Sequence, residues 1–125
     1  MPELRPAAEL GKRGEAMARA YLEARGYTFL GRNWHCRAGE IDLIMRQAND
    51  IVFVEVKTRR GEGAGRAEEA VSASKARKML AAAEWYIGTH PEHEDRFWRC
   101  DLVAITLSAY DPPRIAHFEN AIVIG

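Results

Sequence analysis

Cysteine is scarce in this sequence, and long apolar runs are absent from it. The two cysteines, Cys36 and Cys100, stand far apart and outside any C-x-x-C pair, which argues against a disulfide framework or zinc ribbon and predicts two reduced thiols. No run approaches the roughly 20 apolar residues of a membrane helix, and the opening residues MPELRPAAELGKRGE lack the apolar segment of a signal peptide. We therefore expect a cytoplasmic protein that does not span a membrane.

An excess of charge of either sign is also lacking. The 125 residues carry 18 basic and 18 acidic side chains, which excludes a uniformly basic nucleic-acid-binding surface. The charges are unevenly distributed, however. Residues 56–78 hold seven Lys or Arg against three Glu, a net charge of +4, while all four charged residues from 84 to 95 are acidic. This distribution is consistent with a basic and an acidic side of the molecule, or with a mixed solvated surface.

Length and apolar spacing predict one domain, residues 1–125, with an α/β fold. The expected order is α-β-β-β-α-β-β, with helices over residues 7–25 and 67–87 and strands over residues 27–34, 40–46, 51–58, 97–107 and 114–124. Strands joined through a helix normally become parallel, whereas the first three strands should form an antiparallel meander. The predicted fold is a mixed β-sheet with helices packed on it, and its interior strand covers residues 51–58.

Local expectations concern the glycines and the tryptophans. Gly11 and Gly14 lower the helix propensity of the first helix, so we expect them to let another backbone approach closely. The stretch RRGEGAGRAE, residues 59–68, holds three glycines and predicts a mobile surface loop. Because buried aromatic residues are commoner than base-stacking ones, we assign three tryptophans to the core: Trp34, Trp85 and Trp98.

Three charges interrupt the apolar segment GEIDLIMRQANDIVFVEVKTRR, residues 39–60. Glu55 and Lys57 are two residues apart on one strand and therefore share a face. The residues QAND before this strand are typical of a turn, and a turn with an even number of residues would place Asp42 on the same face. All three side chains would then lie within about 10 Å of one another, at the end of the hairpin away from the turn.

The proximity of two carboxylates has an electrostatic consequence. Asp42 and Glu55 would repel each other and incur a desolvation cost that one lysine does not fully offset. A divalent cation that prefers oxygen ligands, Mg²⁺ or Mn²⁺, resolves this conflict and can share its other positions with a substrate phosphate, which suits phosphodiester hydrolysis. The spacing leaves a structural alternative open, in which Asp42 and Lys57 form an ion pair and Glu55 faces solvent at the strand end.

The charged residues also match a known pattern. Asp42, a variable gap and Glu55-x-Lys57 form the signature of the PD-(D/E)XK nuclease superfamily. The blocks GKRGEAMARAYLEARGY, GEIDLIM, VFVEVKTR and RCDLVAI further resemble the YraN-like family of small bacterial proteins, which is similar to archaeal Holliday-junction resolvases. The resemblance covers roughly residues 11–122 and implies a restriction-endonuclease-like core of order α-β-β-β-α-β.

The resemblance also implies roles for individual residues. Asp42 and Glu55 would bind Mg²⁺ or Mn²⁺, the backbone carbonyl of Val56 would be a further ligand, and Lys57 would assist the attacking water. Glu15 matches an acidic residue that related resolvases use near the metal; the alternative is a helical glutamate that faces solvent.

Other charged residues are assigned to the surroundings of this site. Five basic residues are expected to contact phosphates or else to be ordinary surface charges: Lys75, Arg77, Lys78, Arg59 and Arg60. Glu40 shares the face of Asp42 and would be an outer ligand or an ion-pair partner, while Asp101 is expected to pair with an arginine.

We therefore predict a metal-dependent endonuclease that hydrolyses DNA, in particular branched or structured DNA. A two-fold homodimer is the arrangement that would cut two strands symmetrically. The alternative is a non-catalytic nucleic-acid-binding protein that retains the nuclease fold. A third hypothesis, a sugar hydrolase that uses Asp42 and Glu55 as acid and base, leaves Lys57 and the basic flank unexplained.

Overall fold

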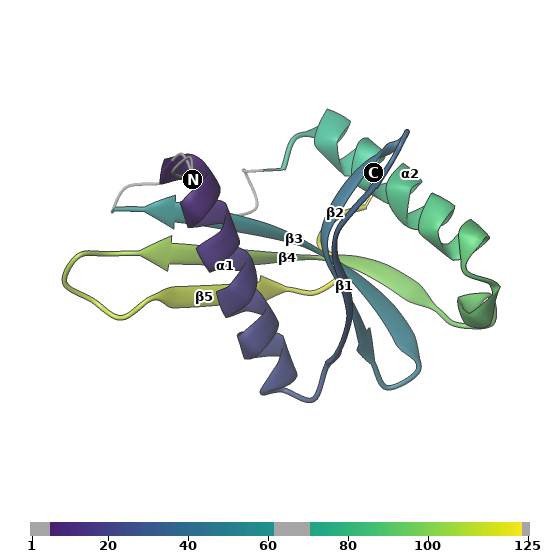
Figure 1. The fold of residues 1–125 in the computed structure, drawn as a ribbon, viewed down its shortest axis with the longest axis horizontal. Helices are drawn as coiled ribbons and strands as arrows, with labels where there is room; N and C mark the ends of the chain where they lie inside the picture. Colours follow the sequence, from purple (N-terminus) through teal and green to yellow (C-terminus); the bar gives the residue numbers. More distant parts are fainter. Residues whose placement is uncertain (1–5, 62–70, 124–125) are drawn as a thin grey trace, which may run out of the picture.

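A computed structural model describes residues 6–61 and 71–123 of the chain, which form an α/β fold. A five-stranded mixed sheet carries two helices, in the predicted order of elements (Figure 1). The elements are α1 (Pro6–Glu23), β1 (Thr28–Cys36), β2 (Gly39–Gln47), β3 (Asp50–Arg60), α2 (Ala73–Thr89), a short 3-10 helix η2 (Pro91–His93), β4 (Trp98–Leu107) and β5 (Arg114–Phe118).

The sheet has the strand order β1-β2-β3-β4-β5, so β3 is its central strand. β1, β2 and β3 form the predicted antiparallel meander, and β4 pairs with β3 in parallel through the crossover helix α2. Alternate residues of β3 serve two cores: Val52 and Val54 pack in the cluster that includes α1, whereas Ile51 and Phe53 pack in the cluster that includes α2. The two apolar faces of this strand therefore give each helix its own core.

The β1–β2 hairpin leaves the rest of the sheet at its far end. β2 pairs with β3 only from Leu43 to Gln47, whereas its pairing with β1 continues to the turn at Gly39. Ile41 accordingly packs in the α2 cluster, and Figure 1 shows the hairpin rising steeply from the plane of β3 and β4 towards α2. This divergence opens the edge of the sheet at the residues that precede Leu43.

The turn between β2 and β3 contains two residues, as an even-residue connection requires. Gln47 pairs with Asp50, and Ala48 adopts a positive φ of 52° inside the turn. Because the number of turn residues is even, even-numbered positions of β2 lie opposite odd-numbered positions of β3. The parity on which the placement of Asp42 depends is confirmed.

Gly14 is the point at which α1 comes closest to β3. A Cβ atom there would lie 1.7 Å from Thr58 Oγ1 and 2.9 Å from Thr58 Cβ, so only a glycine fits. The close approach expected for Gly14 is confirmed, although its neighbour is a side chain. The expectation for Gly11 is wrong, since nothing lies within 4 Å of a Cβ built there.

Several predicted boundaries differ from the structure. α2 begins at Ala73, where the Ser72 side chain accepts a hydrogen bond from the Lys75 backbone N–H; the start predicted near residue 67, and most of the loop at residues 59–68, lie outside the described residues. The last strand ends at Phe118 and not at 124, because the Asn120 N–H donates to the Asp101 side chain and leaves the strand pairing.

The core assignment holds for two of the three tryptophans. Trp34 and Trp98 pack partly buried against the α2 cluster, but Trp85 is 46% exposed on the outer side of α2.

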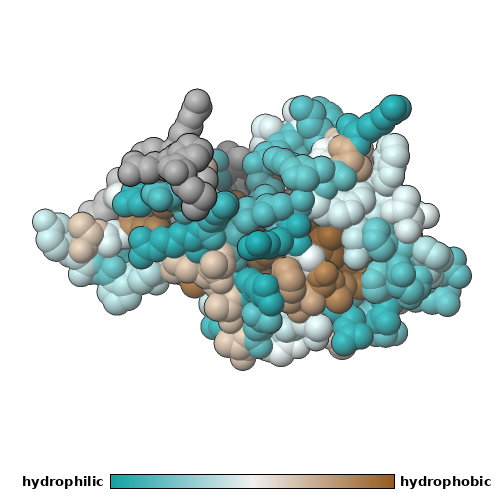
Figure 2. Space-filling view, in the orientation of Figure 1, coloured by the Kyte–Doolittle hydropathy of each residue, from teal (hydrophilic) through white to brown (hydrophobic). Residues whose placement is uncertain are grey.

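Both cysteines are free, as predicted. Figure 2 shows hydrophilic residues over most of one face, with hydrophobic residues visible between the two helices. Neither helix in the described part of the chain is long and apolar enough to cross a membrane.

The contact between Gly14 and Thr58 can be tested by substitution. Gly14→Ala should lower the free energy of unfolding by about 1–3 kcal/mol, because rotation of the Thr58 hydroxyl leaves the Cβ clash in place. Gly11→Ala, in the same helix, should be neutral or stabilising by up to about 1 kcal/mol. Urea unfolding measures both changes, and equal effects of the two substitutions would contradict the close packing of α1 on β3.

Candidate active site

Asp42 and Glu55 lie where β2 and β3 separate. The last paired residues are Leu43 and Val54, so Asp42 and Glu55 are the next residues along the two strands. Beyond this point a side chain, and not the backbone of β2, pairs with β3: Asp42 Oδ2 accepts a hydrogen bond from the Val56 N–H at 2.9 Å. The N–H and C=O of one strand residue point to the same side, so the Val56 carbonyl also faces the gap beside β2.

The two carboxylates interact directly and strongly. Glu55 is only 6% exposed although it is an acid. Burial, and after it the charge of the neighbouring Glu55, raise the pKa of Asp42 to about 7, although the hydrogen bond from the Val56 N–H acts in the opposite direction. Two acids held together in this way ionise simultaneously only when a cation compensates them.

Lys75 of α2 supplies one such cation. Its Nζ forms an ion pair with Glu55 Oε1. Burial alone would lower the pKa of Lys75, but the hydrogen bond and charge of Glu55, together with Asp42, outweigh burial and raise it. The lysine side chain is 47% exposed and reaches the carboxylate from the solvent side. One helix cation thus partly neutralises the carboxylate pair.

The alternative ion pair between Asp42 and Lys57 is contradicted by the structure. That alternative required Glu55 to face solvent, but Glu55 is buried and pairs with Lys75. In residues 6–61 and 71–123, Lys57 forms no ion pair; it is half-buried and lines the same cleft as the two carboxylates. A lysine without a carboxylate partner beside two acids remains free to contact a substrate.

Glu15 reaches the cleft from α1. With its amide oriented to donate, Asn33 Nδ2 lies 3.1 Å from Glu15 Oε1 and holds the carboxylate in place. Burial raises the pKa of Glu15, the contact with Asn33 lowers it, and the charges of Glu40 and Glu55 add to the rise. Glu15 is therefore half-buried among acids and does not face open solvent.

These residues line one cleft of about 340 Å³ to which α1, β2, β3 and α2 all contribute. Its charged lining comprises four acids and two lysines: Glu15, Glu40, Asp42, Glu55, Lys57 and Lys75. Glu40 lies at the rim, where its Oε2 is 3.3 Å from His35 Nδ1. The acids outnumber the cations, which favours binding of a further positive charge.

The oxygen atoms in the cleft fit a small hard cation. Asp42 and Glu55 supply two carboxylates, and the Val56 carbonyl faces the same gap. No group of three or more His, Cys, Asp or Glu side chains in the described ranges converges as a ready ligand set. Mg²⁺ typically uses only one or two carboxylates and keeps waters in its other positions, so this sparse oxygen set suits Mg²⁺ or Mn²⁺ better than zinc.

The remaining predicted residues lie in different places. Arg59 and Arg60 end β3 opposite residues of β4, and neither lines the cleft. Lys78 lines a neighbouring pocket. Asp101 is fully buried and pairs with Arg99, as expected, and also with His117 at 2.7 Å.

Four residues near the cleft have no counterpart in the sequence prediction. Asn33 holds Glu15, His35 and Cys36 face Lys78 across the neighbouring pocket, and the buried Thr58 hydroxyl lies against Gly14. Polar residues at the end of the first strand were the only available signal. Their positions depend on an irregularity of the β1–β2 pairing between Phe29 and Gly31, which a strict alternation of side chains does not anticipate.

Comparison with known proteins gives consistent matches to one family. The model of a family described as uncharacterised protein family UPF0102 matches residues 14–105. A UPF0102 protein of Chloroflexus aurantiacus is 44% identical over 117 residues, covering 94% of this chain and 92% of that protein. A UPF0102 protein of Geobacter sulfurreducens is 45% identical over 112 residues, covering 90% and 87%. The matched range contains all the charged residues that line the cleft.

The carboxylate pair predicts a characteristic pH dependence of stability. Folded Asp42 holds its proton up to about pH 7, whereas the unfolded chain releases it near pH 4, so the folded state binds more protons in between. In metal-free buffer, stability should therefore fall as the pH rises from about 4 through 7. Asp42→Asn keeps an acceptor for Val56 and should be more stable than the parent at pH 8, by on the order of 2 kcal/mol, but not at pH 4.

Urea unfolding of both chains at several pH values measures this difference. Glu84→Gln, an exposed change on α2, serves as the control and should leave the slope of the parent unchanged. A constant difference between parent and Asp42→Asn across this range would show that Asp42 is not a strained carboxylate.

Proposed function

The chain belongs to the uncharacterised protein family UPF0102, and from that premise we propose that it is a divalent-metal-dependent endonuclease that hydrolyses phosphodiester bonds of DNA. One observation carries the proposal: a buried carboxylate, Glu55, and a half-buried one, Asp42, repel each other and share a cleft with a lysine that forms no ion pair with them. The PD-(D/E)XK-like spacing of Asp42, Glu55 and Lys57 agrees with this arrangement.

The carboxylates of Asp42 and Glu55, with the Val56 carbonyl, would hold Mg²⁺ or Mn²⁺. When bound, the ion supplies charge neutralisation for the phosphate and makes a water molecule more acidic. The hydrogen bond from the Val56 N–H fixes one Asp42 oxygen, and the other oxygen would be the metal ligand. The strand ends therefore orient the donors before any substrate arrives, which is the preorganisation that catalysis needs.

The lysines have separate tasks in this proposal. Lys57 lines the cleft beside the carboxylates and has no ion-pair partner within residues 6–61 and 71–123, so its ammonium can orient the attacking water and stabilise charge on the phosphate. Lys75 neutralises Glu55 in the free protein and becomes available to a phosphate oxygen once another cation compensates Glu55. Glu15, held by Asn33, can accept a hydrogen bond from a water molecule in the cleft.

Branched or structured DNA is the proposed substrate, on the strength of the resemblance to resolvases. A two-fold dimer would present two clefts to two strands and explain a symmetric cut. The sugar hydrolase is the weaker hypothesis, because an acid and a base suffice for it and it gives no role to Lys57, which lines the same cleft as the two carboxylates.

One observation favours a second candidate, a nucleic-acid-binding protein without catalysis. The Lys75–Glu55 ion pair already compensates one carboxylate, so the site can be stable without a metal. This candidate predicts DNA binding that persists when Glu55 and Lys57 are replaced, with no cleavage by the parent. The two candidates therefore differ in a single assay.

The assay is cleavage of junction, flap and linear DNA in Mg²⁺ or Mn²⁺. Glu55→Gln and Lys57→Met should each reduce the rate by on the order of 100-fold or more while the proteins stay folded, because each change removes a group that acts on the reacting phosphate. Glu84→Gln removes an exposed acid of α2 and should retain the parent rate. Absence of cleavage by the parent on every substrate, or full activity of Glu55→Gln, would contradict the nuclease proposal.

Metal binding has a readout that does not require activity. Mn²⁺ should raise the thermal midpoint of the parent, because an ion that binds only the folded state stabilises it by mass action. The shift should be largely lost in Asp42→Asn and in Glu55→Gln, and retained in Glu84→Gln. Equal shifts in all four proteins would place the ion elsewhere.

A further inference from the structure

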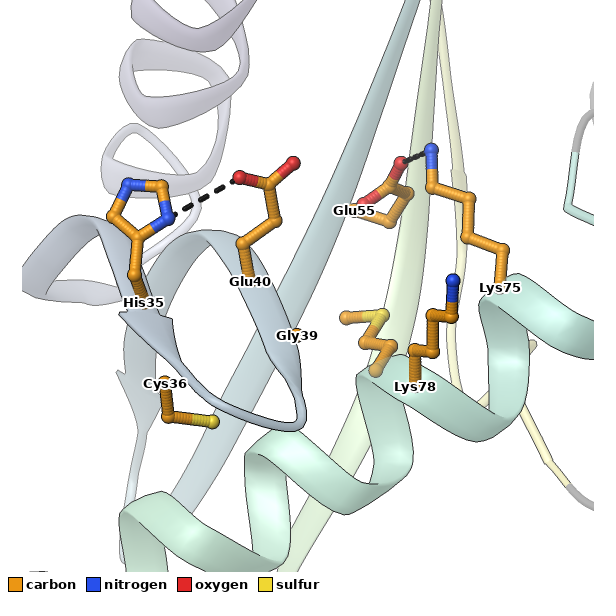
Figure 3. A pocket seen from close by; sticks show the side chains of 8 residues that line it. His35, Cys36, Gly39, Glu40, Glu55, Lys75 and Lys78 are labelled. Carbon is orange, nitrogen blue, oxygen red and sulfur yellow. Dashed lines mark ion pairs between the residues drawn. The ribbon is translucent and has the colours of Figure 1, made fainter.

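A second pocket adjoins the cleft and shares Glu55 of the carboxylate pair with it. It has a volume of about 360 Å³ and lies between the β1–β2 hairpin and the first turns of α2. Glu40, Glu55 and Lys75 line both cavities, so the two spaces meet at the carboxylate of Glu55. Figure 3 shows Glu40 on the hairpin and Lys75 on the helix facing each other across this opening.

The far walls of the pocket are partly apolar. Met79 is buried, Cys36 is half-buried, and Gly39 has no side chain, so these residues form a surface without charge. Lys78 rises from α2 beside Lys75 and contributes a second ammonium to the rim (Figure 3). The charged lining is mixed, since Glu40 and Glu55 stand opposite the two lysines. The apolar wall suits the flat face of a ligand, and the two ammonium groups suit a negatively charged attachment.

At Gly39 the hairpin packs closely on α2, which forms one wall of the pocket. A Cβ atom on Gly39 would lie 3.0 Å from the Lys78 carbonyl oxygen and 3.3 Å from Lys78 Cβ. On the other side, the pairing of Cys36 with Gly39 closes the hairpin. The two walls are therefore held together by main-chain contacts.

We propose that this pocket receives one unpaired nucleobase next to the scissile phosphate, so that the substrate of the cleft is DNA with an unstacked nucleotide at the cut site. This inference rests on the proposed function and specifies its substrate. A cavity of about 360 Å³ has room for a base, and a base leaves a duplex only at the cost of unstacking and unpairing. Flaps, gaps and junction branch points offer such a nucleotide without that cost, whereas continuous duplex does not.

The lysines give the proposed ligand a defined orientation. The base enters between Met79 and Cys36, while its flanking phosphates meet Lys75 and Lys78 at the rim. Because Lys75 also borders the carboxylate cleft, the phosphate beside the bound base is the one presented to Asp42 and Glu55. The chain thereby selects where along a strand the reaction occurs, without reading sequence.

Cys36 provides a probe inside the pocket. The only other cysteine, Cys100, is buried, and burial raises the pKa of its thiol to about 12, so iodoacetamide should alkylate Cys36 selectively. We expect a DNA duplex with a single-stranded flap, bound in Ca²⁺, to slow alkylation of Cys36 by ~10-fold. A fully paired duplex of the same length should leave the rate nearly unchanged.

A matched pair of substitutions on α2 extends this test. Lys78→Ala removes a charge that lines the pocket and should weaken binding of the flap DNA about 3- to 10-fold. Arg77→Ala removes the same charge from the adjacent, exposed position outside the pocket and should weaken it by less than about 2-fold. Fluorescence anisotropy of labelled DNA measures both affinities.

Each outcome bears on the pocket independently of catalysis. Equal protection of Cys36 by flap and paired DNA, absence of protection by bound flap DNA, or failure of flap DNA to bind would each overturn the assignment. Cleavage of DNA without selective protection of Cys36 would leave the nuclease proposal intact and contradict the nucleobase assignment of the pocket. Selective protection of Cys36 without cleavage would support the pocket as a nucleotide site and contradict the nuclease proposal.

Discussion

The hydrogen bond from the Val56 N–H to the Asp42 carboxylate marks the point at which β2 and β3 stop pairing. Up to Leu43 and Val54 the strands satisfy each other's backbone groups, and beyond them a side chain performs this function for one strand. A Val56 N–H without a hydrogen-bond partner would be costly at this buried strand. Asp42 supplies the acceptor, and the hydrogen bond in turn stabilises its carboxylate where the sheet opens. The same divergence carries the β1–β2 hairpin towards α2 and creates the space that both cavities occupy.

This arrangement concentrates negative charge where the protein can least solvate it. Glu55 continues the apolar face of β3 and is buried beside Asp42, and Glu15 approaches from the opposite helix. Lys75 partly compensates the pair, while Lys57 forms no ion pair among the residues that the structure describes. The surrounding fold keeps these acids close together although their charges repel each other, and groups perturbed in this way are common at functional sites. The two cores on either side of β3 provide the stability that this strain requires.

Much of the fold and part of the site could be predicted from the sequence. Side chains alternate with a period of two along a strand, and an even turn preserves parity, so Asp42 and Glu55 could be assigned to one face before the structure was known. The central position of β3 followed in the same way from its two apolar faces. An arginine partner was expected for Asp101, and Arg99 of the same strand is that partner.

The partners of the carboxylates could not be predicted in this way. Lys75 reaches Glu55 only because α2 packs across the face of β3, a tertiary contact that periodicity does not specify. Asn33 meets Glu15 through irregular pairing of β1, and Cys36 faces α2 because the hairpin leaves the sheet. Trp85 was assigned to the core because it is aromatic, but it lies exposed on the outer side of α2.

The most direct test of the central claim is the anomalous scattering of Mn²⁺ in crystals of the protein. The account predicts a peak within ligand distance of both the Asp42 and the Glu55 carboxylates and of the Val56 carbonyl, with Lys75 moved away from Glu55. A crystal saturated with Mn²⁺ that shows no peak there, and in which Lys75 still pairs with Glu55, would contradict it.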